Sequence, residues 1–146
     1  MFTWRKSQLL GVGILAVAIG ATAAYSNYAA TNQPREITVQ FSRGTDMKAG
    51  GEERITEAAG YMFANDAYTA RILGHTGTVG SHTANQKLGQ RRAETVKKML
   101  VDSEIDPERI NTLGVGGAQP LAKEDDESTR AYQRRLSRAT IVLRRD

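Results

Sequence analysis

Residues 72–93, ILGHTGTVGSHTANQKLGQRRA, contain the pattern that decides the fold. A short apolar run leads into a loop that is punctuated by Gly74, Gly77 and Gly80, and the loop continues into a long stretch with helical periodicity. Glycine lets a backbone turn tightly and approach a ligand, while the start of a helix offers free N–H groups and the positive end of a dipole. The order of strand, glycine loop and helix predicts an anion-binding site in this loop.

The residues on either side of this stretch alternate between strand and helix patterns. Strands alternating with helices imply crossover connections, so the predicted fold class is α/β (α+β), a β-α-β-α-β-β mixed sheet with two helices packed on it. A connecting loop is expected between the last two strands, over 116–130. Period-two alternation predicts strands over 37–41, 69–74, 110–115 and 138–143, and a helical period predicts helices over 51–65 and 84–101.

The first 25 residues have a different composition from the rest of the chain. Two basic residues, Arg5 and Lys6, precede sixteen residues without a charge, 9–24. The basic start, the apolar centre and the small residues at its end fit a cleaved signal peptide. With Tyr25 the apolar run also reaches the lower limit of roughly 17 residues for a membrane-spanning helix. Both alternatives stay open.

The domain organisation follows from this segment. We expect residues 1–25 to be a signal peptide or a single membrane anchor, an N-terminal apolar helix in either case. A linker is expected over 26–35 and one globular domain over 36–146. The basic start is expected to stay inside, which places the domain outside the cytoplasm whether the helix is cleaved or retained. Small residues at 16, 20 and 24 form a stripe that favours self-association of this helix or a membrane-protein partner.

Composition argues against several classes of function. Residues after position 30 carry eighteen basic and sixteen acidic side chains, a net charge of only +2, which does not favour a nucleic-acid partner. The chain has no cysteine, so no disulfide or thiolate metal site is available. His75 and His82 have no evident third ligand, and no catalytic motif is present. We therefore expect no enzyme, no metal and no cofactor.

Three motifs, in this order, resemble the OmpA-like peptidoglycan-associated domain family. They are similar to the family patterns G-[HY]-T-D-x-x-G-[ST], N-x-x-L-S-x-x-R-A and G-x-G-[ES]-x-x-P. In this chain the three read GHTGTVGS at 74–81, NQKLGQRRA at 85–93 and GVGGAQP at 114–120. The resemblance covers about three quarters of the chain, from Ile37 onward.

The resemblance implies a non-catalytic domain in the periplasm or cell envelope of a Gram-negative bacterium. Such a domain binds the diaminopimelate residue of the peptidoglycan stem peptide, and the arginine at position 92 is expected to pair with its free carboxylate. The family aspartate that pairs with its free ammonium is replaced here by Gly77. The implied ligand-binding residues are Arg92, Gly77, Thr76, Thr78, Gly80 and Asn85.

The substitution at position 77 leaves two interpretations of the chain. Loss of one partner of a charge pair costs about 2 kcal/mol or more, so peptidoglycan binding is expected to be weakened. Alternatively, the chain is an envelope scaffold that keeps the fold without the ligand. By its helical position alone, Arg92 also fits an arginine whose stem packs on the sheet while its charged end reaches water.

Overall fold

The computed structural model describes residues 33–145. The expected N-terminal helix over 1–25, and its choice between signal and anchor, lie outside the described residues. None of the described helices is long and apolar enough to cross a membrane. Residues 34–146 form one compact unit, which contains the whole of the expected domain.

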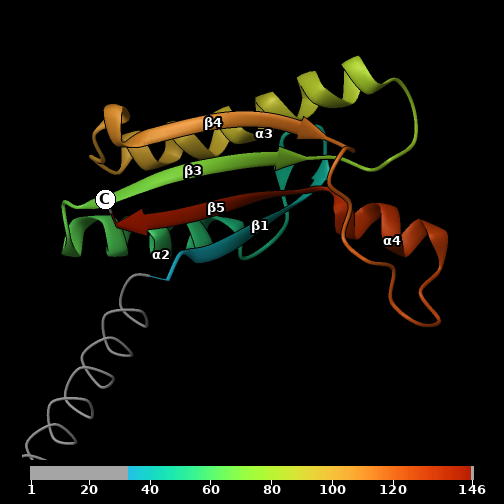
Figure 1. The fold of residues 1–146 in the computed structure, drawn as a ribbon, viewed down its shortest axis with the longest axis horizontal. Helices are drawn as coiled ribbons and strands as arrows, with labels where there is room; N and C mark the ends of the chain where they lie inside the picture. The colour runs from blue at the N-terminus through green and yellow to red at the C-terminus, as the bar shows by residue number, and fades with distance from the viewer. Residues whose placement is uncertain (1–32, 146) are drawn as a thin grey trace, which may run out of the picture. The chain divides into compact units, whose positions relative to one another are not determined.

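A five-stranded sheet in the order β2-β1-β5-β3-β4 forms the centre of the domain (Figure 1). Strands β3 and β4 are parallel, and all other neighbours are antiparallel, so the predicted mixed sheet is confirmed. The elements, in chain order, are β1 (Arg35–Arg43), β2 (Asp46–Met47), α2 (Gly51–Ala64), β3 (Tyr68–His75), α3 (His82–Asp102), the 3-10 turn η1 (Pro107–Arg109), β4 (Ile110–Gly116), α4 (Thr129–Leu136) and β5 (Arg138–Arg145).

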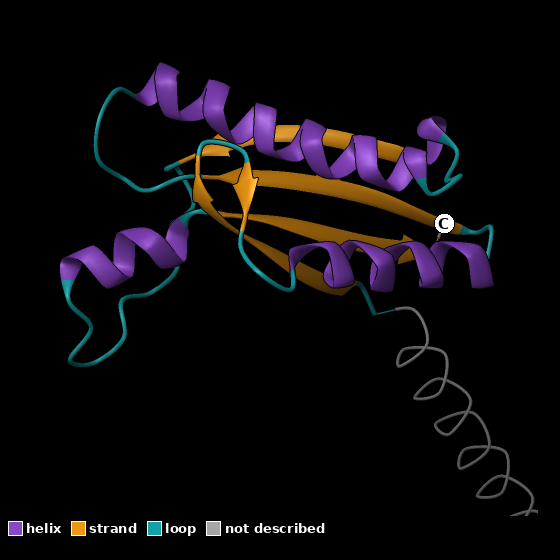
Figure 2. Ribbon diagram, turned by 180° about the vertical axis from the view of Figure 1, so that it is seen from behind, coloured by secondary structure: helices purple, strands orange, loops and turns teal. Residues whose placement is uncertain are grey.

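Helices α2 and α3 cover the same face of the sheet, whereas α4 lies beyond its end (Figure 2). The strand side chains that point toward the two helices are apolar, as the period-two pattern requires. Ile37, Ile141 and Ile72 form one such row across β1, β5 and β3, and all three are buried. Val96 of α3 and Ile55 of α2 belong to the same core, which therefore lies between the sheet and the two predicted helices.

Glycines allow α3 to lie directly against the backbone of the sheet. A Cβ atom on Gly74 would lie 1.8 Å from the carbonyl oxygen of Gly89, and a Cβ on Gly89 would lie 2.3 Å from the carbonyl oxygen of Gly74. A Cβ on Gly114 of β4 would meet the backbone of α3 at Gln86 at 2.4 Å. These contacts are backbone to backbone, so no rotamer change could relieve them. The close approach fixes where the side chains of α3 meet the end of β3.

Two elements were not predicted. The two-residue strand β2 pairs with the end of β1 and closes a hairpin whose turn contains Gly44, with φ +51°. Helix α4 begins within the expected loop over 116–130, where the Ser128 hydroxyl accepts a hydrogen bond from the backbone N–H of Ala131. Its Arg135 binds Glu127 through two N–H groups, at 2.9 and 2.8 Å, which fastens the loop to the helix.

Candidate functional site

The loop between β3 and α3 is held at its far end by the first turn of α3. Gly80 has φ +100°, a left-handed conformation that favours glycine. Ser81 then caps α3, its hydroxyl accepting from the backbone N–H of Ala84 at 3.4 Å. The Asn85 amide Nδ2 donates to the carbonyl of Val79 at 3.0 Å. Gly80 and Asn85 therefore shape the loop, and the free N–H groups expected at this helix start are partly used by its own cap.

Arg92 lies on the sheet-facing side of α3 and reaches the near end of the loop. Its Nη1 donates to the carbonyl oxygen of His75, the last residue of β3, at 2.8 Å. Its Nε donates to the carbonyl of Gly44 in the β1–β2 turn at 2.7 Å. The guanidinium carbon lies 5.2 Å from the centre of the Phe41 ring, within range of a cation–π contact. Arg92 thus joins three segments that are far apart in the sequence.

The charge of Arg92 is buried, and no carboxylate of residues 33–145 lies beside it. The residue is 3% exposed, far less than an arginine whose stem packs on the sheet while its charged end reaches freely into water. Burial lowers the pKa of Arg92 to about 10, which leaves it protonated at neutral pH. In the described range Arg92 makes no ion pair. Two of the five guanidinium N–H groups donate to carbonyls, and the other three, both on Nη2 and one on Nη1, have no protein partner in that range.

A glutamine from α4 occupies the space beside Gly77. A Cβ atom on Gly77 would lie 2.3 Å from Oε1 of Gln133. The backbone N–H of Thr78 donates to that oxygen at 2.9 Å, and Nε2 of Gln133 donates to the Thr78 hydroxyl at 2.9 Å. The neighbouring Thr76 is buried, and its hydroxyl donates to the carbonyl of Gly77 at 2.9 Å. The loop is therefore fastened to α4 at the position where the family motif has an aspartate.

Comparison with known proteins agrees with this arrangement. A profile described as the OmpA family matches residues 41–134. The chain belongs to the OmpA family. The resemblance inferred from the three motifs is therefore confirmed, and the matched range runs from the end of β1 into α4.

Similar proteins come from several bacteria. Outer membrane porin F of Pseudomonas fluorescens is 34% identical over 69% of this chain and 31% of its own length. The structure of the peptidoglycan-associated lipoprotein of Burkholderia pseudomallei superposes with a TM-score of 0.65 over 73% of this chain and 89% of that one, at 21% identity. The structure of the cell wall anchor of the type VI secretion system of Pseudomonas aeruginosa has a TM-score of 0.60 over 77% and 82%, at 18% identity. The chain spans a third to a half of the length of the curated relatives it matches first.

Within this OmpA-family chain, the predicted site residues form two groups. Arg92 meets the start of the loop through the His75 carbonyl. Asn85 meets the end of the loop through Val79, and Thr78 faces α4 instead. That these residues bind a ligand stays a prediction. Sequence reasoning missed Gln133, because α4 was not predicted and 55 residues separate Gln133 from Thr78.

His75 and Arg138 form a second buried polar pair beside the site. His75 is 3% exposed, and its Nδ1 atom has no hydrogen-bond partner within the described range. Burial, followed by the nearby charge of Arg138, lowers the pKa of His75 from 6.5 to about 4, so the ring is neutral at physiological pH. Arg138 is buried as well and donates to the carbonyls of Leu136 and Gln119, each at 3.4 Å. The surroundings of the loop therefore carry buried positive charge.

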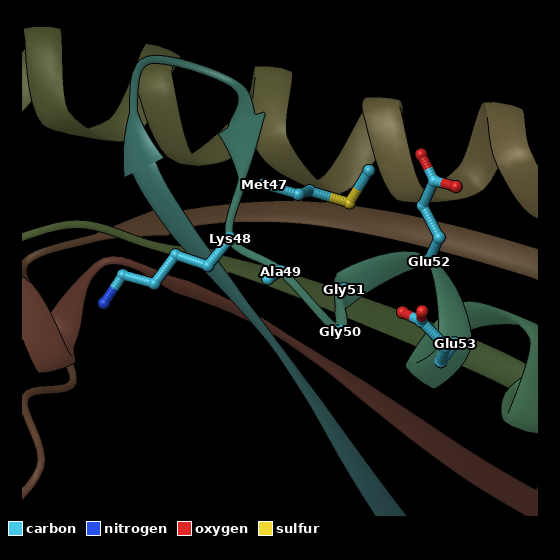
Figure 3. A pocket seen from close by; sticks show the side chains of 7 residues that line it. All are labelled: Met47, Lys48, Ala49, Gly50, Gly51, Glu52 and Glu53. Atoms are coloured by element: carbon cyan, nitrogen blue, oxygen red, sulfur yellow. The ribbon is translucent and has the colours of Figure 1, made fainter.

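A separate pocket lies at the start of α2 and contains none of the predicted ligand-binding residues (Figure 3). Glu52 and Glu53 lie on its helical side and Lys48 on the preceding turn. Helix α2 begins here after Gly50, which provides no side-chain cap. In the range that the structure describes, no group of three or more His, Cys, Asp or Glu side chains is placed to hold a metal ion.

Proposed function

We propose that this chain is a non-catalytic cell-envelope module that binds peptidoglycan through the carboxylate of a diaminopimelate side chain. The observation that carries the proposal is the burial of Arg92 without a carboxylate partner among the described residues. The family and the relatives named as peptidoglycan-associated or as a cell wall anchor support the same class of ligand.

The electrostatics explain why this site favours an anion. Moving a charge out of water is costly, and the two carbonyl groups that Arg92 contacts compensate only part of that cost. A carboxylate can accept two parallel hydrogen bonds from one guanidinium, and such charge-assisted bonds are stronger than neutral ones. The unpartnered Nη2 of Arg92 offers the first of these donors. Binding a carboxylate therefore adds the counter-charge that the described part of the domain does not itself supply.

Gly77 limits the affinity for diaminopimelate, because position 77 has no carboxylate for the ligand's ammonium. It lies two residues beyond His75, at most about 7 Å of extended chain from the strand end that Arg92 contacts. A glycine has no side chain with which to pair the ammonium of diaminopimelate. Loss of about 2 kcal/mol corresponds to a roughly thirtyfold weaker complex. We therefore infer that the chain binds the wall weakly, as a module that associates and dissociates.

The cellular setting belongs to the same proposal. A periplasmic position follows from the basic residues before the apolar segment of the first 25 residues, with the domain either anchored to the inner membrane or released after cleavage. The small-residue stripe in this segment favours self-association or a membrane-protein partner. Fractionation of cells with and without a block of signal peptidase distinguishes anchoring from release.

Co-sedimentation of the full chain with purified sacculi in mild detergent tests the proposal. Arg92→Ala is expected to abolish co-sedimentation, since it removes the only proposed carboxylate partner. Arg91→Ala is the matched control, because Arg91 is the neighbouring, exposed arginine of the same helix. Equal binding by both variants and the unchanged chain would overturn the proposal. Absence of binding by the unchanged chain would instead support the scaffold alternative that Gly77 favours.

A further inference from the structure

The amide of Gln133 has a defined orientation above Gly77. The backbone N–H of Thr78 can only donate, so the atom of Gln133 that lies 2.9 Å from it is the oxygen, Oε1. Nε2 then donates to the Thr78 hydroxyl at 2.9 Å. One lone pair of Oε1 and one N–H of Nε2 are thereby used. The second lone pair of Oε1 is still available to accept a hydrogen bond from a ligand.

This amide lies where a side chain at position 77 would begin. The separation of 2.3 Å between Oε1 and an added Cβ is too short, so the end of the glutamine side chain would have to shift to admit a side chain at position 77. Gly77 does not have a left-handed backbone, so its conformation does not require glycine. Instead, the lack of a side chain at position 77 leaves the space that the amide of Gln133 occupies. The two positions form one unit, contributed by the loop and by α4.

We propose that Gln133 is a specificity-determining residue, which replaces a carboxylate at position 77 with a neutral hydrogen-bond acceptor. This inference rests on the proposed function, with Arg92 binding the ligand carboxylate. A carboxylate acceptor favours an ammonium group, because the two charges attract. An uncharged amide oxygen has no such preference, and it accepts equally well from the N–H of an amide. The site therefore has no charge that would favour a free ammonium over a nitrogen that is acylated beside the bound carboxylate.

The chemistry of the cell wall provides such a group. Where the side-chain amine of diaminopimelate has been joined to another stem peptide, its ammonium is converted to an amide N–H, and the adjacent carboxylate stays free. An amide nitrogen carries no charge, so placing it beside Gln133 costs less desolvation than placing an ammonium there. The partner that fits this site is accordingly the cross-linked form of the stem peptide.

A matched pair of ligands tests the preference. A muropeptide monomer that contains diaminopimelate has one free amine, and N-acetylation turns that amine into an amide while the carboxylate is kept. Titration calorimetry with the full chain in detergent is expected to show that the acetylated form binds at least as tightly as the free amine. A preference for the free amine by about fivefold or more, the size of an exposed ion pair, would overturn the proposal.

Gln133→Glu is the decisive variant, since it keeps the shape of the side chain and adds one negative charge. We expect it to reverse the preference, with the free amine bound about fivefold more tightly than the acetylated form. Arg134→Gln changes the net charge by the same amount on an exposed neighbouring residue of α4. It is expected to leave the preference of the unchanged chain as it is. An equal shift in both variants would show that net charge, and not Gln133, decides, and would overturn the proposal.

The outcome for Arg92 separates this inference from the proposed function. If Arg92→Ala binds both forms as the unchanged chain does, the proposed function fails. If Arg92→Ala loses both forms while Gln133→Glu changes nothing, only the role of Gln133 fails. Hydrogen exchange at the Thr78 amide gives a readout without ligand. That amide is expected to exchange faster in Gln133→Ala, and an unchanged rate would contradict the contact on which the inference depends.

Discussion

Arg92 and Arg109 each fasten a loop by donating to backbone carbonyl groups, but they differ in burial and in counter-charge. Arg109 donates from Nε and Nη2 to the carbonyl of Tyr68 and from Nη2 to those of Met62 and Asn65. Its Nη1 lies 3.6 Å from the exposed carboxylate of Asp66. Arg92 makes two such bonds, is more deeply buried and faces no carboxylate in the described range.

The difference separates a structural arginine from a binding one. Arg109 has its donors directed at the turn between α2 and β3, and its charge is near solvent and near an acid. Arg92 keeps donors without a protein partner in the described range on a side chain that is only 3% exposed, which is a costly arrangement for stability alone. We interpret that cost as the property that makes Arg92 available to a ligand carboxylate.

The largest expected effect is on binding, and it should distinguish the two arginines completely. Arg92→Ala removes one partner of a buried charge pair in the complex, so we expect a loss of about 3–5 kcal/mol, more than a hundredfold in affinity for a muropeptide. Arg109→Ala is expected to leave this affinity unchanged. Calorimetric titration of both variants measures the difference. Similar losses in the two would show that Arg92 acts only through stability, as Arg109 does.

The second effect is on the pH dependence of stability, through the histidine whose carbonyl Arg92 contacts. Burial holds the pKa of His75 at about 4 in the folded chain, against 6.5 in the unfolded one. The unfolded state therefore binds the additional proton first, and the free energy of unfolding falls as the pH drops from about 6.5 to about 4. The loss from this group reaches about 3 kcal/mol at pH 4 and is absent above pH 7.

Denaturant unfolding between pH 7 and pH 4 checks this expectation. His75→Gln should flatten the slope, whereas the exposed His82→Gln should keep it. The chain has only these two histidines, so the comparison isolates the group. If the free energy of unfolding of His75→Gln changed with pH as steeply as that of the unchanged chain, carboxylates and not His75 would cause the pH dependence.

Much of this arrangement could be predicted from sequence, and the failures have physical causes. The spacing of Leu88, Arg92 and Val96 placed Arg92 on the apolar side of its helix, where the structure has it. β2 has only two residues, too few for a period-two pattern. Helix α4 has eight residues, of which only Leu136 is buried. Its sequence therefore has no helical period of apolar residues from which the helix could be predicted.

The parts of the site that were missed depend on tertiary contacts. Local patterns report which face of an element is apolar, and they do not report which distant side chain fills a given space. Gln133 lies beside Gly77 only because α4 packs next to the loop. The sequence therefore indicated that position 77 lacks an aspartate, but it could not indicate that another residue occupies the space.

The third effect is the loss of stability when Arg109 is removed. Arg109→Ala leaves the carbonyls of Met62, Asn65 and Tyr68 without this donor, which is expected to lower the free energy of unfolding by about 2 kcal/mol. Thermal or urea unfolding at pH 7 measures the loss. Lys98→Ala is a suitable control, because the ion pair of Lys98 with Asp102 is exposed and is expected to contribute at most about 0.5 kcal/mol. A loss no larger than that of the control would contradict the structural role.

The smallest expected effect is on the stability of Gly77→Asp, the variant that introduces the family aspartate. Gly77→Asp places a Cβ 2.3 Å from Gln133 Oε1, so the glutamine must move and lose its two hydrogen bonds to Thr78. We expect a loss of about 1 kcal/mol in the free energy of unfolding, and a smaller one when Gln133→Ala is already present.

A double-mutant cycle of these two substitutions therefore has a positive coupling. In the same cycle, the affinity for a muropeptide with a free amine should rise in the double variant more than in Gly77→Asp alone, because only the double variant has both the carboxylate and the space for it. If the stability losses of the two substitutions were additive, and Gly77→Asp and the double variant bound the muropeptide equally, the glutamine would move away without cost. Gly77 and Gln133 would then be independent features of the loop and of α4.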